Sequence, residues 1–94
     1  MAIRRLVIDV LIPHEPDVLT YANLINDLPG TDGITIDVVE NDERTKTVEI
    51  TIEGEDLPFE NIKQVIEDTG GSIHSIDQVS AGNTIVKPGK HSEE

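Results

Sequence analysis

The clusters of residues that could do chemistry in this 94-residue chain consist of carboxylates and histidines, and the chain contains no cysteine. Three carboxylates fall within a short polar segment at Glu40, Asp42 and Glu43. Hard cations such as calcium take several oxygen ligands, so this segment is a candidate divalent-cation site, with Asp77 as a further candidate ligand. The segment lacks the Asp-x-Asp-x-Asp-Gly pattern of a calcium loop. The alternative is an acidic turn that is only solvated.

The histidines suggest a second kind of site. His14 is followed by Glu15 in a proline-flanked segment, and His74 lies three residues before Asp77. Imidazoles bind metals and polar ligands, so we expect His14, Glu15 and His74 to be ligand-binding residues if the fold brings them together. A small enzyme using His74 and Asp77 as an acid–base pair is the alternative. Strand alternation argues against that pair, because residues three apart face opposite sides.

No recognised catalytic motif accompanies these residues. The chain has no glycine-rich phosphate loop and no nucleophile elbow. Without cysteine it has no disulfide, thiolate metal site or cysteine nucleophile, which is compatible with a reducing compartment. We therefore predict no catalytic residues and a non-enzymatic module that binds a small ligand or a divalent cation such as calcium.

Charge narrows the range of partners. The chain has 19 Asp and Glu against 7 Lys and Arg, a formal net charge of −12. This balance argues against binding to nucleic acid or to a membrane surface, because both depend on basic patches. It fits a salt-rich cytoplasm, where repulsion between carboxylates is screened, although an ordinary acidic protein is the alternative.

Targeting signals are not evident in the chain. No apolar run approaches the roughly 20 residues of a membrane-spanning helix. Asp9 interrupts the apolar run that follows Arg4 and Arg5, which argues against a secretory signal peptide. We expect a cytoplasmic protein.

The elements that must position these residues follow from apolar periodicity. Alternation predicts strands over residues 3–12, 34–39, 47–53 and 72–81, with a hairpin between the second and third. Helical spacing predicts one helix with Pro16 at its first position and a second helix that starts at Leu57-Pro58. Pro29-Gly30 should end the first helix, and Gly70-Gly71 the second.

This β-α-β-β-α-β order predicts an α+β protein with the ferredoxin-like arrangement. Right-handed crossovers place both helices on one face of a four-stranded antiparallel sheet, with the first and third strands central. We expect a single domain over residues 1–83 and a flexible C-terminal tail over residues 84–94.

The sheet face opposite the helices, called the open face below, mixes polar and apolar residues. Such a face commonly packs against another subunit, although scattered apolar residues on a solvated face are also normal. We predict a homo-oligomer, with the protein itself as its partner. The expected interface residues are Arg5, Val7, Asp9, Val39, Glu49 and Ile76.

Three segments of the chain resemble the small archaeal domain-of-unknown-function family number 211, over about residues 2–86. They are residues 3–11 followed by Pro13-His14-Glu15-Pro16, then residues 50–54, and finally residues 70–82, whose Ile-His-Ser-Ile-Asp stretch is the most specific. The resemblance implies a ferredoxin-like fold, an archaeal source, ring-like or other homo-oligomers, no established activity, and calcium as a candidate ion. This chain is more acidic than the family pattern, which agrees with a haloarchaeal origin and puts lysine-dependent contacts in doubt.

Overall fold

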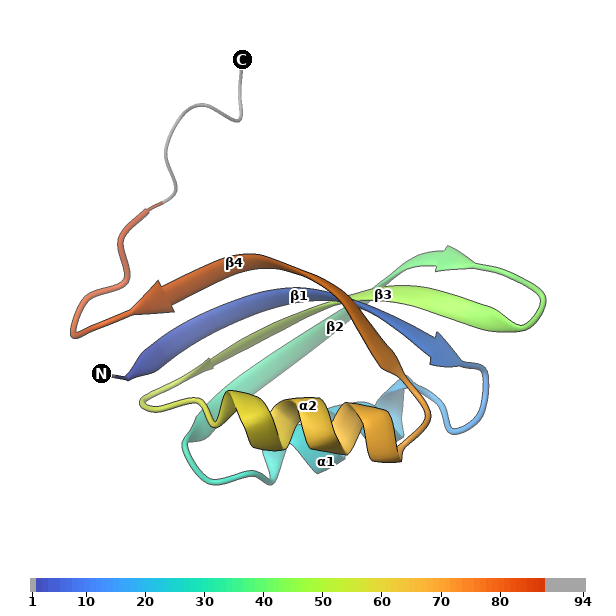
Figure 1. Ribbon diagram of the computed structural model, residues 1–94, viewed down its shortest axis with the longest axis horizontal. Helices are drawn as coiled ribbons and strands as arrows, with labels where there is room; N and C mark the ends of the chain where they lie inside the picture. Colours follow the sequence, from blue (N-terminus) through green and yellow to red (C-terminus); the bar gives the residue numbers. More distant parts are fainter. Residues whose placement is uncertain (1, 88–94) are drawn as a thin grey trace, which may run out of the picture.

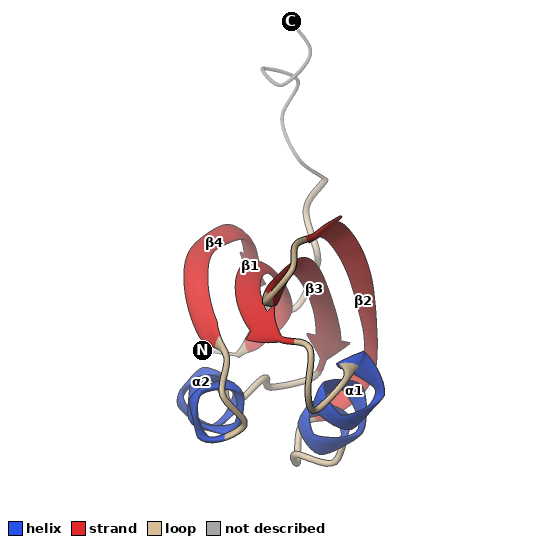
Figure 2. Cartoon of the chain, turned by 90° about the vertical axis from the view of Figure 1, so that its right-hand side faces the viewer, coloured by secondary structure: helices blue, strands red, loops and turns tan. Residues whose placement is uncertain are grey.

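The computed structural model describes residues 2–87, which form a four-stranded antiparallel sheet with two helices on one side (Figures 1 and 2). The strands are β1 (Ile3–Pro13), β2 (Thr31–Asn41), β3 (Thr45–Gly54) and β4 (Ser72–Ala81), and the helices are α1 (Val18–Asn26) and α2 (Phe59–Asp68). The sheet order is β2-β3-β1-β4. The predicted ferredoxin-like fold, with β1 and β3 central, is therefore confirmed. Of the predicted tail over 84–94, residues 88–94 lie outside the described residues.

The core lies between the two central strands and the helices. Every second residue of β1 and β3 faces the helices, as the alternation predicts. These positions are fully apolar and almost completely buried, and they contact Tyr21 and Ile25 of α1 and Ile62 and Ile66 of α2. The strand residues of this layer are Leu6, Ile8, Val10, Ile12, Val48, Ile50 and Ile52.

Both helices begin later than their prolines predict. Helix α1 starts at Val18, and its N-cap is Asp17, whose carboxylate accepts hydrogen bonds from the backbone N–H groups of Leu19 and Thr20. An Asp side chain at the N-cap satisfies otherwise orphaned backbone donors, which a proline cannot do. Pro16 therefore precedes α1. In α2 the N-cap position is held by Pro58 itself, which makes no side-chain hydrogen bond to the helix.

The predicted end of α2 at the glycine pair is confirmed in detail. Gly70 has φ +107°, and the N–H groups of Gly70 and Gly71 donate to the carbonyls of Glu67 (3.1 Å) and Ile66 (2.8 Å). This pair of bonds is the Schellman motif, which needs a left-handed residue just after the helix. The motif turns the chain sharply into β4.

Strand β4 departs from simple alternation, which corrects the predicted place of Ile76. Its register with β1 shifts three times, and two of these shifts leave His74 and Asp77 as extra residues of β4. Ile76 therefore pairs with Ile8, whose side chain faces the helices. Paired residues share a sheet face, so Ile76 lies on the helix side and not on the open face. The bulges allow apolar residues spaced by three, Ile73, Ile76 and Val79, to share that side.

Strand β2 contains a similar irregularity at Val39. Val38 pairs with Val48 and Glu40 with Thr47, so Val39 is an extra residue without a partner in the ladder. The alternation that placed Val39 in line with Asp37 on the open face therefore stops at this bulge. Beyond it, the β2–β3 hairpin extends past the helices (Figure 1).

Neither helix within residues 2–87 has the length and apolar character needed to cross a membrane.

Candidate functional site

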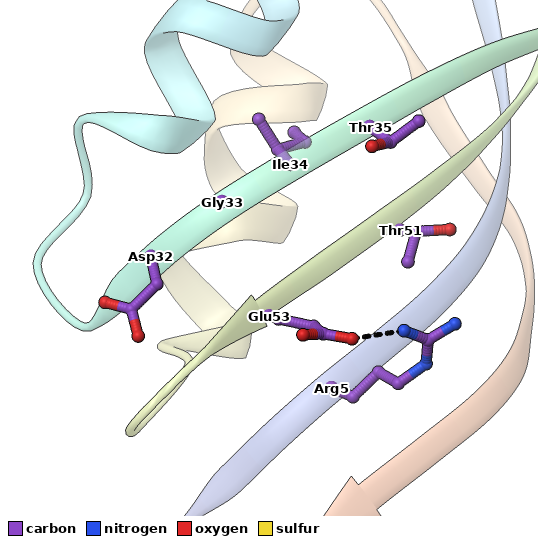
Figure 3. Close-up of a pocket in the computed structure, with 7 residues that line it drawn as sticks. All are labelled: Arg5, Asp32, Gly33, Ile34, Thr35, Thr51 and Glu53. Carbon is purple, nitrogen blue, oxygen red and sulfur yellow. Dashed lines mark hydrogen bonds and ion pairs between the residues drawn. The ribbon is translucent and has the colours of Figure 1, made fainter.

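The open face carries a hollow where three strands align their side chains. Arg5 of β1 pairs with Glu53 of β3, and Glu53 pairs with Gly33 of β2. Two residues further along each strand, and on the same face, Thr51 of β3 pairs with Thr35 of β2. The hollow has a volume of about 540 Å³ (Figure 3). Its lining consists of Arg5, Asp32, Gly33, Ile34, Thr35, Thr51 and Glu53.

Arg5 is held in place at one side of this hollow. Its Nε donates to Gln78 Oε1 at 2.6 Å, and its Nη1 forms an ion pair with Glu53 (Figure 3). Gln78 is also the β4 partner of Val7, so the Arg5 and Gln78 side chains lie beside Val7 on this face. Val7 is consequently only 8% exposed, although no helix covers it.

The middle of the open face carries a row of three carboxylates. Glu49 of β3 pairs directly with Asp9 of β1 on one side and with Asp37 of β2 on the other. Like charges at paired positions repel, because the Cβ atoms of such pairs are about 5 Å apart. No Lys or Arg within residues 2–87 forms an ion pair with any of the three. This acidic row makes the middle of the face a poor surface for a second copy of the same face.

His74 lines a second, smaller hollow on the open face. The hollow has a volume of about 300 Å³, and its other lining residues are Asp9, Val10, Leu11 and Thr47. His74 makes no hydrogen bond to Asp77 within the described part of the chain, since Asp77 Oδ1 instead accepts one from Ser75 Oγ at 2.8 Å. The acid–base pair of the enzymatic alternative is therefore not assembled in this structure.

His14 lies at the opposite end of β1 from Arg5, close to the hairpin. Its Nε2 is 2.6 Å from the backbone carbonyl oxygen of Asp42. Glu15 is exposed in the same loop. The structure thus joins His14 to the predicted cation segment, but only through the main chain of Asp42. His74 lies beside other residues, those of the second hollow.

The predicted cation ligands do not form a cluster. Glu40, Asp42 and Glu43 are exposed at the hairpin, whereas Asp77 is on β4 at the other edge of the sheet. Within residues 2–87, no three His, Asp or Glu side chains are arranged so that they could hold a metal ion. Cation binding by these four residues stays a prediction.

Sequence reasoning missed the residues around the larger hollow, except Arg5. Asp32, Thr35, Thr51 and Glu53 are ordinary residues for strands that face solvent. The one available signal was Gly33, because a glycine inside a strand weakens it and often marks a bulge, as here, or the close approach of another group.

The fold and the open face define a class of protein: a small α+β ferredoxin-like domain with a polar, hollowed sheet face. The chain belongs to the domain-of-unknown-function family 211, described as "Uncharacterized ArCR", whose model matches residues 4–94. It is 47% identical to an uncharacterised protein of the archaeon Methanocaldococcus jannaschii over 85 residues, which is 90% of this chain and 88% of the relative. These matches confirm the resemblance seen in the sequence.

Proposed function

We propose that the protein is a non-enzymatic module that assembles with copies of itself through the two edges of its sheet. The observation that carries this proposal is an apolar strip on the helix side of each edge strand, part of which is exposed. The strips are Ile34, Ile36 and Val38 on β2, and Ile73, Ile76 and Val79 on β4. Val38 on β2 is 47% exposed, and on β4 Ile76 is 49% and Val79 is 53% exposed. Exposed apolar side chains grouped on an element are typical of protein interfaces.

The edges fit a subunit contact better than the open face does. Stacking two open faces would bring the carboxylates of Asp9, Asp37 and Glu49 from both copies together without a counter-charge. Burying unpaired charges costs several kcal/mol each. Val7 offers little additional burial, because its own neighbours already cover it.

The two edges are different strands, and we propose that each copy contributes one edge to each of its two neighbours. A contact between β2 of one copy and β4 of the next is heterologous, and repeated heterologous contacts close into a ring when the rotation permits. Copies of net charge −12 repel each other, so assembly should strengthen as salt screens that repulsion.

Light scattering coupled to size-exclusion chromatography tests the proposal, at about 0.1 M and about 2 M salt, where the screening length differs several-fold. We expect the wild type to be oligomeric at the higher salt and Val79→Lys to be monomeric. The added lysine lowers the net negative charge, so a loss of assembly cannot come from greater overall repulsion. Leu24→Lys on α1 is the matched control, because Leu24 is also exposed (42%) but belongs to a helix and not to either edge strand.

A wild-type monomer at both salt concentrations would contradict the proposal. Equal loss of assembly in Val79→Lys and Leu24→Lys would contradict the edge contact.

A further inference from the structure

We propose that the hollow beside Gly33 binds a small organic ammonium ion. This is a ligand site on the open face, separate from the apolar edge strips through which we propose self-assembly. It rests on the open space beside a strand glycine, an excess of free hydrogen-bond acceptors, and the size of the hollow.

Gly33 is the first observation. Its φ is not in the left-handed region, and a Cβ atom built at this position would meet nothing within 4 Å. No packing contact therefore requires glycine here, although Gly33 directly follows a β-bulge, where Asp32 is an extra residue of β2 and glycine is common. Glycine inside a strand costs about 0.5–1 kcal/mol relative to alanine. What the missing side chain does provide is open space in the hollow between Asp32 and Glu53 (Figure 3).

The second observation is the balance of donors and acceptors around that space. Within residues 2–87, the side chains of Asp32, Thr35 and Thr51 make no hydrogen bond, and Glu53 uses only Oε2, in its ion pair with Arg5. Carboxylate oxygens only accept hydrogen bonds, and the two hydroxyls can also accept. A ligand rich in N–H donors would satisfy these groups.

The charges favour a cation over an anion. The guanidinium of Arg5 is already engaged by Gln78 and Glu53. Arg5, Asp32 and Glu53 together give the lining a net negative charge, within a chain of net charge −12. A negative field raises the local concentration of small cations and repels anions.

The size of the hollow sets the class of ligand. About 540 Å³ lies within the range of small-molecule sites in proteins. A compact primary amine or diamine fits this space. A bare metal ion would leave most of it unfilled.

Isothermal titration calorimetry with 1,4-diaminobutane tests the site, with tetramethylammonium as the matched cation that has no N–H donor. We expect the diamine to bind the wild type and tetramethylammonium to give no saturable heat. Gly33→Val fills the hollow and should weaken diamine binding at least tenfold. A β-branched residue suits a strand, so this variant should melt at the same temperature as the wild type or higher.

Thr47→Val, in the second hollow beside His74, should leave diamine binding unchanged. The proposal is overturned if the wild type binds no diamine up to about 10 mM, a concentration that detects even millimolar affinity. It is also overturned if Gly33→Val binds the diamine as tightly as the wild type does, or if tetramethylammonium binds equally well.

Discussion

Tyr21 of α1 donates a hydrogen bond from its hydroxyl to the backbone carbonyl of Thr69, the C-cap of α2, at 2.9 Å. The ring of Tyr21 is fully buried in the core between the helices and the sheet. The hydroxyl thus joins the two helices at the point where the chain turns into β4. Thr69 also donates from its own hydroxyl to the carbonyl of Val65 at 2.7 Å, which fixes this last turn of α2.

Tyr21→Phe should lower the free energy of unfolding by about 1 kcal/mol, the usual net value of a buried hydrogen bond. The ring still fills the core, but the Thr69 carbonyl loses its partner. For a domain of this size the melting temperature should fall by roughly 4–8 °C. Thermal and urea unfolding followed by circular dichroism measure the change. Melting at the wild-type temperature would show that water replaces the hydroxyl at no cost.

Alkaline pH should destabilise the protein through the same residue. Burial raises the pKa of Tyr21 above its ordinary value of 10.0. The unfolded chain then loses the phenolic proton at a lower pH than the folded protein, so this contribution to stability is complete below about pH 10 and is lost as pH rises further. We expect the free energy of unfolding to decrease above about pH 10. Because the chain has one tyrosine, tyrosinate absorbance reports this ionisation alone.

Tyr21→Phe provides the control for that pH dependence. The variant has no tyrosine to ionise, so its stability should decline less steeply above about pH 10 than that of the wild type. Parallel curves for the two proteins would mean that other groups cause the alkaline loss.

The acidic row makes Glu49 a position where removal of a charge should stabilise the protein. Glu49 faces Asp9 and Asp37 on its two neighbouring strands. Glu49→Gln keeps the shape of the side chain and removes both repulsions, so we expect a gain of about 0.2–1 kcal/mol at low salt. The gain should shrink at about 2 M salt, where charges are screened over about 3 Å or less. Urea unfolding at both salt concentrations measures it.

Glu55→Gln is the matched control for Glu49→Gln. It makes the same change in net charge at an exposed position in the loop between β3 and α2. We expect a smaller gain than at Glu49. Equal gains in both variants would show that overall charge, and not the cross-strand row, limits stability. The wild type itself should gain stability as salt rises.

The hypothesis of a cation site at the hairpin predicts that calcium raises the melting temperature. A ligand that binds only the folded state at 100 times its dissociation constant adds about 2.7 kcal/mol. The Glu43→Gln variant should not show this calcium-dependent rise in melting temperature. The Asp77→Asn variant tests whether Asp77, on β4, is a further calcium ligand. Differential scanning calorimetry with calcium and with magnesium makes the measurement. An unchanged melting temperature, together with no heat on titration, would end the hypothesis.

Much of the fold could be predicted because its signals are local. Each of these signals depends only on residues that are close together in the sequence. They are the alternation in β1 and β3, the polar segment between β2 and β3, and the Gly70-Gly71 pair. The helix starts were less predictable, because Asp17 and Pro16 are both common at helix entries and only the backbone geometry shows which one caps the helix.

The candidate site was less predictable than the fold. The hollow depends on the register that sets Arg5, Glu53 and Gly33 side by side, and these residues are 20 to 48 positions apart in the chain. Register comes from the pairing of whole strands and their turns, so no single residue signals it. Gly33 was the only residue whose type gave a local indication of the hollow.

The sequence by itself determined the order of elements, the apolar side of the central strands and the family, because periodicity and local turn residues are sufficient for these. Only the tertiary structure decided which side chains of the edge strands face the helices. Two bulges in β4, at His74 and Asp77, and two in β2, at Asp32 and Val39, shift the alternation within each strand. A bulge forms when packing against a neighbouring strand and the core favours an extra residue, and that balance exists only once the sheet is assembled.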